Sequence, residues 1–177
     1  MHWFVLRCSP GKELALQQSI QTRFGVECFV PIERKRQHDN HGRFVWRERC
    51  ALSSYIFVRT EKEVFYTIPK TITSVHAMMR MEEGFWHLVI VNDKAMSDFI
   101  RVSGNKEERA VYLDPAKLHF KKGDRVRVIG GSFTGVEGYF MQIGGKHEKR
   151  VVIQLDQFIA VSTAAIPAAL VEKLMGQ

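Results

Sequence analysis

Cysteine is scarce in this chain of 177 residues: Cys8, Cys28 and Cys50 are the only three, and they lie far apart. An odd number of cysteines without a C-x-x-C pair argues against a zinc site or a redox dithiol. No apolar run approaches the roughly 20 residues of a membrane helix. The first residues lack the basic region of a secretory signal and lead directly into a strand-like pattern. We therefore expect a cytoplasmic protein that does not enter a membrane.

Catalytic motifs are also missing from the sequence. There is no H-E-x-x-H pattern among the seven histidines, and the glycine pair at Gly130 and Gly131 lacks the spacing of a phosphate-binding loop. We expect no catalytic residue, no metal ligand and no cofactor, so the sequence favours a binding protein over an enzyme.

What the chain does have is positive charge. Lysine and arginine total 26 against 19 acidic residues, which gives a net charge of +7, and the sequence pI is near 9.5. A basic balance favours polyanionic partners such as nucleic acid. Hydrophobic residues make up 45% of the chain, enough for packed cores.

The pattern of apolar residues predicts an α+β arrangement of helices on an antiparallel sheet. Trp3 to Cys8 is typical of a strand, and Ser9 is suited to cap a helix that stops at Gly25. Asn92 or Asp93 is expected to cap a later helix. Further strands are predicted at Val26–Pro31, Phe44–Leu52, Tyr55–Arg59, Val75–Met79 and Phe85–Val91, with a short helix from Thr60 to near Pro69.

The segment from Phe120 to Ile143 consists of two alternating runs around a turn rich in glycine. The four glycines of this turn are expected to supply the positive φ that tight bends need: Gly130, Gly131, Gly135 and Gly138. Strands near Arg150–Leu155 and Phe158–Ser162 should follow, and a short helix from Pro167 to Leu174. The segment resembles the KOW motif of NusG-type transcription factors, with an unrelated SH3-like barrel as the alternative.

Two further segments carry the same resemblance. The run from Trp3 to Glu13 is similar to the opening of the NusG N-terminal domain. The strand from Tyr55 to Val58 resembles that family's P-G-Y-[VIL]-[FL]-V strand, although Ser53 and Ser54 stand where proline and glycine are usual. The resemblance implies a NusG N-terminal (NGN) domain over 1–102, a linker over 103–118 and a C-terminal SH3-like KOW β-barrel over 119–177.

Among NusG paralogues, the Trp3-Phe4 start, the basic hairpin and the end of the chain are similar to the UpxY-type antiterminators of Bacteroidales surface-polysaccharide operons and to the RfaH group. This implies a monomeric transcription antitermination and elongation factor that binds RNA polymerase on specific long operons. The alternatives are a general housekeeping NusG factor and a KOW-containing, ribosome-associated protein that binds RNA.

The resemblance also implies where the polymerase binds. In the family, an apolar cavity beside the strand after the hairpin receives the clamp helices of the polymerase β′ subunit. Tyr55 and Phe57 alternate with Ile56 and Val58, so they share one face of a strand. Four residues are expected to line or rim the cavity: Arg7, Leu52, Tyr55 and Phe57. The alternative for Tyr55 and Phe57 is an ordinary place in the core.

Nucleic acid is expected at three places. The basic hairpin contributes Arg34, Lys35, Arg36 and Arg43, which suit contacts with upstream duplex DNA or the non-template strand. By resemblance, the helix face with Arg23 and the junction at Lys70 and Thr71 also contact non-template DNA. The alternative for the hairpin charges is a solvated face without a partner.

The C-terminal barrel is expected to bind a second partner. Leu155 and Phe158 flank a turn that should expose an apolar strand edge. By resemblance, that partner is a small-subunit ribosomal protein or the termination factor Rho. The sequence leaves RNA open as an alternative.

Overall fold

The structure, a computed structural model, describes residues 1–105, 110–113, 124–142, 149–156 and 159–174. It divides into two compact units, Met1–Val91 and Asn92–Gln177. The boundary predicted from the sequence, at residue 102, lies eleven residues later than the structure has it. The difference is helix α3 (Asp93–Gly104), which packs on strands of the C-terminal unit. No helix of the described residues has the length and apolar character needed to cross a bilayer.

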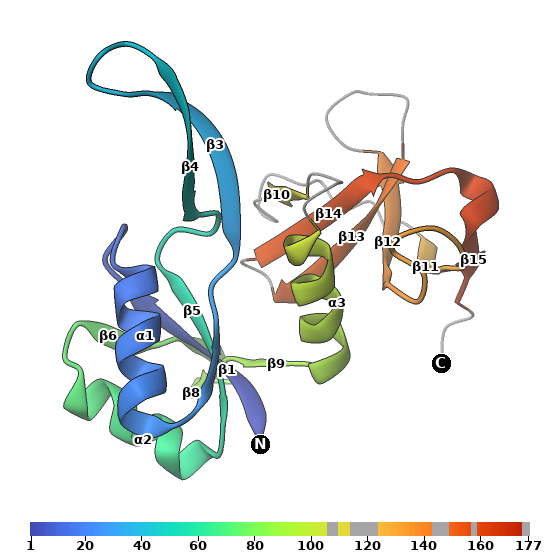
Figure 1. Ribbon diagram of the computed structural model, residues 1–177. Helices are drawn as coiled ribbons and strands as arrows, with labels where there is room; N and C mark the ends of the chain where they lie inside the picture. The colour runs from blue at the N-terminus through green and yellow to red at the C-terminus, as the bar shows by residue number, and fades with distance from the viewer. Residues whose placement is uncertain (106–109, 114–123, 143–148, 157–158, 175–177) are drawn as a thin grey trace. The chain divides into compact units, whose positions relative to one another are not determined.

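The N-terminal unit is built on a five-stranded antiparallel sheet (Figure 1). Its central strand β1 (His2–Cys8) pairs with β5 (Tyr55–Thr60) on one side. On the other side β1 pairs with β6 (Val75–Ala77) and β9 (Ile90–Val91). The edge strand β2 (Glu27–Phe29) pairs with β5. The predicted α+β arrangement is therefore present in this unit.

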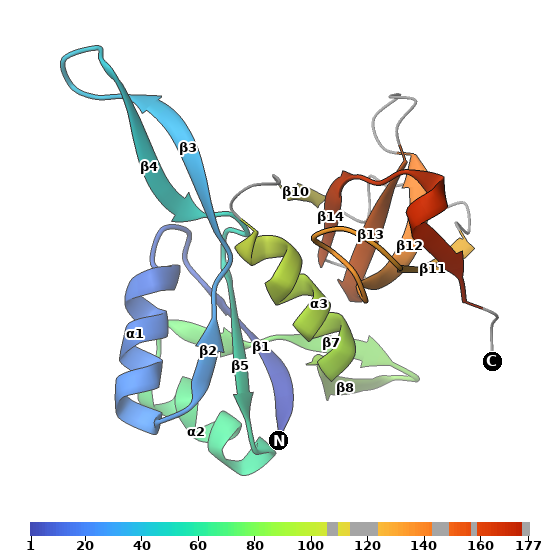
Figure 2. The ribbon, with the colours of Figure 1, turned by 45° about the vertical axis from the view of Figure 1, so that its right-hand side comes forward.

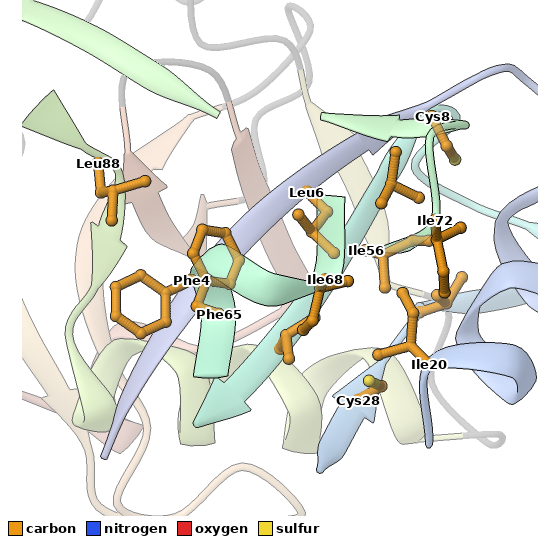
Figure 3. Close-up of a cluster of buried hydrophobic side chains, with 13 residues drawn as sticks. Phe4, Leu6, Cys8, Ile20, Cys28, Ile56, Phe65, Ile68, Ile72 and Leu88 are labelled. Atoms are coloured by element: carbon orange, nitrogen blue, oxygen red, sulfur yellow. The ribbon is translucent and has the colours of Figure 1, made fainter. Parts of the chain in front are cut away.

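One face of this sheet holds the core beneath helices α1 (Glu13–Phe24) and α2 (Lys62–Thr71). Side chains alternate along β1, so Phe4 and Leu6 point into this core from the same face. Figure 3 shows them with Ile20 of α1 and Phe65 of α2. The rings of Phe4 and Phe65 stack with centroids 4.5 Å apart. Core packing thus fixes the register of β1 and, with it, the residues on the opposite face.

Helix α1 ends as predicted but begins later. Gly25 closes it in the left-handed conformation, with φ of 63°. The predicted cap at Ser9 is wrong: Gly11 has φ of 80°, which a helix cannot contain, and the helix starts at Glu13. The buried carboxylate of Glu13 accepts a hydrogen bond of 2.7 Å from the backbone N–H of Ser54. This bond ties the start of α1 to the turn before β5.

The turn before β5 contains Ser53 and Ser54, the two serines that stand where the resemblance leads one to expect proline and glycine. Ser54 has φ of 76°, a left-handed conformation that glycine adopts without strain and other residues seldom do. Ser53 also reaches the same carboxylate, with its hydroxyl 3.5 Å from Glu13. The carboxylate holds the turn in the shape that the usual proline and glycine would otherwise favour.

Two hairpins extend from the N-terminal unit as separate two-stranded sheets (Figures 1 and 2). The first pairs β3 (Ile32–His38) with β4 (Phe44–Cys50). The second pairs β7 (Met79–Glu82) with β8 (Phe85–Leu88). Glu83 and Gly84 join the second pair with φ of 49° and 83°, as a tight two-residue hairpin turn requires. The turn at Glu83 and Gly84 agrees with expectation, but the predicted strand Val75–Met79 is wrong in its bounds, because Val75–Ala77 pairs with β1 and the hairpin strand is Met79–Glu82. In the first hairpin, residues 33–38, expected in a basic tip, form part of β3.

Helix α3 opens the C-terminal unit. The side chain of Asn92 caps it as predicted, accepting hydrogen bonds from the backbone N–H groups of Lys94 and Ala95. The helix packs on β13 and β14. Its polar side chains bind the glycine-rich turn: Lys94 donates to the carbonyl of Gly135, and Arg101 to the carbonyl of Ser132. The buried carboxylate of Asp98 accepts from the backbone N–H of Glu137.

The sheet of this unit has six antiparallel strands in the order β10-β14-β13-β12-β11-β15. The four predicted strands correspond to β11 (Asp124–Val128), β12 (Glu137–Gln142), β13 (Lys149–Asp156) and β14 (Ile159–Ala165). Two edge strands were not predicted. They are β10 (Val111–Leu113), inside the segment expected to be a linker, and β15 (Val171–Lys173), where a helix was expected.

The predicted helix from Pro167 to Leu174 is wrong. Residues Ala168–Leu170 form one 3-10 turn, and the chain then pairs with β11 through Val171 opposite Val128. Flanking bonds join Ile129 to Leu170 and Leu174 to Arg125. The edge of β11 is the reason, because pairing with it satisfies backbone donors and acceptors that a short helix would leave to solvent.

Candidate functional site

The hairpin of β3 and β4 carries its side chains on two exposed faces with different chemistry. Residues paired across the strands share a face, so Arg36 lies beside Trp46 and His38 beside Phe44. Diagonal contacts complete this face, which we call the aromatic face. The guanidinium of Arg34 lies 5.9 Å from the ring centroid of Trp46, and that of Arg36 lies 4.2 Å from the ring of Phe44. Cations and aromatic rings therefore alternate along most of it, and Glu48 lies on the same face opposite Arg34.

The opposite face of the hairpin is polar. It presents Lys35 opposite Arg47, and Glu33 opposite Arg49. An ion pair of 2.6 Å joins Arg49 to Glu33. Counted from Ile32 to Cys50, the hairpin has six cationic and three acidic residues, a net charge of +3. The hairpin as a whole therefore attracts a polyanion, but only one face offers rings.

The tip of the hairpin is held by Asp39. Its carboxylate accepts hydrogen bonds from the backbone N–H groups of Arg43 and His41, at 2.9 and 2.8 Å, and from the guanidinium of Arg43. The bond from the backbone of Arg43 is the main reason that the pKa of Asp39 is lowered. Arg43, predicted to contact DNA, is thus tied to the turn, which shapes the end of the hairpin.

The surface predicted for polymerase lies on the face of β1 and β5 opposite the helices. Arg7 pairs directly with Tyr55, and its guanidinium lies 5.8 Å from the ring centroid. Tyr55 is half-buried and Arg7 is exposed. Leu52 is also half-buried, just before the strand. Arg7 and Tyr55 therefore form one continuous piece of surface.

Phe57 does not belong to that surface. It shares the face with Tyr55, as the alternation predicted, but its side chain is fully buried and its ring lies 6.4 Å from that of Phe29. The expected place of Phe57 in an open cavity is therefore wrong, and the core alternative holds for this residue.

A depression of about 580 Å3 lies next to Arg7. It is lined by both polar and apolar side chains, with Ser54, His76 and Pro10 beside Arg7. Tyr55 and Leu52, where the apolar hollow was expected, are not among its lining residues.

The other predicted DNA-binding residues are not gathered at the hairpin. Arg23 is in the last turn of α1, beside a depression of about 300 Å3 that includes Ser19 and Thr22. Lys70 and Thr71 end α2, where the Thr71 hydroxyl donates to the carbonyl of Thr67. The hairpin tip and α2 lie at opposite ends of the unit in Figures 1 and 2. These residues would therefore reach a different part of any bound nucleic acid.

In the C-terminal unit, the exposed strand edge predicted at Leu155 is wrong. Leu155 is 8% exposed and lies in β13, which is paired on both sides, with β12 and with β14. Phe158 lies outside the described residues. The structure therefore gives no exposed apolar edge at Leu155.

Two aromatic residues that sequence reasoning did not assign to a site, Phe44 and Trp46, have the clearest site geometry. The strand prediction for Phe44–Leu52 gives them no role in a site, although they recur at every second residue of β4 while Arg34, Arg36 and His38 recur at every second residue of β3. That shared period of two was a usable signal. Only the register of β3 and β4, however, shows that the rings and the guanidiniums share one face.

The cysteines show no sign of chemistry. All three thiols are free, and burial raises their pKa values to about 11 for Cys8 and Cys50 and about 12 for Cys28. A thiol is a poor nucleophile and a poor metal ligand until it loses its proton. Within the described ranges, no three His, Cys, Asp or Glu side chains are grouped as a metal site would need.

Comparison with known proteins gives a consistent picture. Residues 1–108 match the family described as “Transcription termination factor nusG”. The chain is 23% identical over 168 residues to the transcription termination/antitermination protein NusG of Borreliella burgdorferi, covering 86% of this chain and 89% of that protein.

Two solved structures are similar at lower levels. One, described as domain interaction in Thermotoga maritima NusG, is 20% identical, with a TM-score of 0.48 and coverage of 98% of this chain and 97% of that chain. The other, an MjSpt4:Spt5 complex, is 14% identical, with a TM-score of 0.32 and coverage of 99% of both chains.

Proposed function

Since this chain belongs to the NusG family, we propose that it binds the β′ clamp helices of RNA polymerase through the surface around Arg7 and Tyr55 and promotes processive transcription. Proteins of this family are transcription termination and antitermination factors rather than enzymes, and they bind RNA polymerase. The proposal makes the chain an elongation and antitermination factor that acts in the cytoplasm as a monomer.

One observation carries this proposal: the guanidinium of Arg7 lies over the half-buried ring of Tyr55 at an accessible place on the sheet. Such a pair offers a rigid apolar ring beside a fixed positive charge, and arginine and tyrosine are enriched where proteins bind each other. A helix tip that covers the ring gains by burying apolar area, at roughly 25 cal/mol per Å2 before the costs of association.

Binding of this kind would act on the polymerase by selection between conformations. A factor that binds the closed clamp more tightly than the open, paused form shifts the population toward the closed one. No bond is made or broken in this step. The C-terminal unit, as a KOW domain, would recruit a second protein such as a small-subunit ribosomal protein or Rho while the first unit holds the polymerase.

Replacing both Tyr55 and Leu52 by aspartate is expected to weaken binding to purified RNA polymerase at least about tenfold, or about 1.4 kcal/mol, because two carboxylates would be desolvated at the interface. Titrating each variant over immobilised polymerase in a surface-binding assay measures the change in affinity. Tyr66→Asp is the matched control, since Tyr66 is 40% exposed on α2 and carries the same ring. If the double variant binds as tightly as the Tyr66 variant, the surface is assigned wrongly.

The second part of the proposal concerns which operons the factor acts on. We infer a factor for a few long operons of the surface-polysaccharide kind, on the likeness of the basic hairpin to that of UpxY-type paralogues. Deleting the gene is then expected to lower distal transcripts of a few operons only, as transcript profiling would show. A pausing defect across the genome would instead indicate a general NusG factor.

A further inference from the structure

We propose that the aromatic face of the β3–β4 hairpin stacks unpaired bases of single-stranded DNA, with Phe44 and Trp46 as the platforms and Arg34 and Arg36 as phosphate and stacking contacts. The inference rests on the proposed function and deepens it, because it names what the hairpin would meet beside a transcribing polymerase. Neither the family resemblance nor the charge pattern predicts a role for these two rings, Phe44 and Trp46.

Exposure of the rings is the first support. Trp46 is 51% exposed and Phe44 is 57% exposed, although each has a guanidinium within 6 Å of its ring centroid. The hairpin forms a sheet of its own, so these rings fill no core. Aromatic side chains on which bases can stack, within a basic groove or strip, are the shared feature of proteins that bind single strands.

The arrangement of charge is the second support. Arg34 and Arg36 lie against rings, so guanidinium planes and rings make one mixed surface, in which Glu48, opposite Arg34, is the acidic member. Bases stack on guanidinium planes as well as on rings, and the same guanidiniums attract phosphates. The hairpin's net charge of +3 suits a polyanion and opposes docking of a basic protein surface.

The second hairpin shows what an aromatic surface without this chemistry looks like. Trp86 is 63% exposed on β8, and the residues that share its face are Met79, Met81 and Leu88. None of these four residues is a cation. This face offers a comparable ring without the charge, so the two hairpins form a natural pair for comparison.

An unpaired strand suits the aromatic face better than a duplex does. In a duplex each base is covered on both sides by its neighbours, so the rings would find only sugar and phosphate edges. In a single strand, base faces and phosphates are both accessible. We commit to DNA because the hairpin charges are expected to contact upstream duplex DNA or the non-template strand, and of these two only the non-template strand is unpaired.

The test is a titration of the full chain with a labelled oligothymidylate of about 12 nucleotides, followed by fluorescence anisotropy. Trp46→Ala is expected to weaken binding at least about fivefold, since loss of one aromatic ring on which a base stacks reduces affinity by that factor or more. Trp46→Phe, which keeps a ring, should retain most of the affinity and guards against simple disruption of the hairpin. Trp86→Ala should leave the affinity unchanged.

Salt dependence separates stacking from charge. Arg34→Gln with Arg36→Gln should flatten the plot of log affinity against log salt by about 0.7 for each phosphate that is no longer neutralised. Trp46→Ala should shift the line without changing its slope. Binding by Trp46→Ala within twofold of the native chain overturns the proposal. So does an equal reduction in the Trp86 variant, or duplex bound as tightly as the single strand.

Two further measurements decide whether the ligand of the aromatic face is DNA, RNA or protein. Tighter binding of the matching RNA oligonucleotide would overturn the assignment to DNA. Loss of polymerase binding by Trp46→Ala with DNA binding intact would make the face a protein-binding surface and also overturn it. The Tyr55 and Leu52 double variant should bind the oligonucleotide normally, so failure of the polymerase proposal and failure of this one give different results.

Discussion

Replacing Gly138 by alanine is expected to destabilise the C-terminal unit by about 3 kcal/mol and to lower its melting temperature by more than about 10 °C. A methyl group at this position would lie 2.4 Å from the carbonyl oxygen of Val152 and 2.8 Å from a methyl of Val151. The first of these is backbone in the neighbouring strand β13. It can move only if the hydrogen bonds between β12 and β13 are broken.

The matched control is Gly130→Ala. A methyl group there would lie 2.9 Å from the end of the Leu170 side chain, which can rotate away, so we expect a loss of at most about 1 kcal/mol. Neither glycine has a positive φ. All three tryptophans, Trp3, Trp46 and Trp86, are in the other unit, so hydrogen exchange of peptides from β12 and β13 is the suitable measurement. Equal reductions in protection in the two variants would contradict the steric argument.

The second large effect is expected at Glu13. Its side chain is buried, at 2% exposure, and accepts hydrogen bonds from Ser54 and Ser53. Glu13→Ala should lower the free energy of unfolding of the N-terminal unit by about 2–3 kcal/mol, because a charge-assisted hydrogen bond is removed and a donor is left without its acceptor. Urea unfolding followed by tryptophan fluorescence measures this, since all three tryptophans are in this unit.

Glu63→Ala is the control for helix electrostatics. Glu63 is in the first turn of α2, as Glu13 is in the first turn of α1, but it is exposed. Its removal should cost less than about 1 kcal/mol, the usual value of a carboxylate near a helix start. A similar destabilisation in both variants would mean that the helix dipole, not the bond to Ser54, explains the role of Glu13.

The same carboxylate predicts how stability varies with pH. Burial raises the pKa of Glu13, but hydrogen bonds from the backbone of Ser54 and from nearby N–H groups outweigh it and lower the pKa below its ordinary value. The stabilisation is therefore complete above the unfolded pKa, about 4.3, and is lost as the pH falls through the folded pKa. Glu13→Gln should lose less stability than the native chain over that window, measured as the difference between their unfolding curves.

Local signals in the sequence predicted the elements with local causes. Gly25 ends α1 and Asn92 caps α3, because each acts within a few residues of itself. The strand at Tyr55 was recognisable from its β-branched and aromatic residues. Elements with remote causes were not predicted. The strand β15 exists because β11, more than 40 residues earlier, leaves an edge to pair with, and no local pattern reports that.

The candidate site was predictable in outline and not in detail. Charge located the hairpin, but β3 has no buried alternation because both its faces are exposed, so its pattern did not indicate a strand. Alternation placed Phe57 on the face of Tyr55 but could not tell that one ring is buried and the other half-buried. The prediction of positive φ is confirmed for Gly131 and Gly135 and is wrong for Gly130 and Gly138, and at Gly138 the lack of space for a side chain is what requires glycine.

The isolation of the β3–β4 ribbon has a consequence for how such factors diversify. Its strands pair only with each other, and Cys50 at its base is the one described side chain of the ribbon that packs against the core. Insertions, deletions or exchanges farther along it should therefore leave the folding of the rest of the unit nearly untouched. Selection can then change the length and side chains of the ribbon in one lineage after another, while the sheet that carries Arg7 and Tyr55 is kept constant.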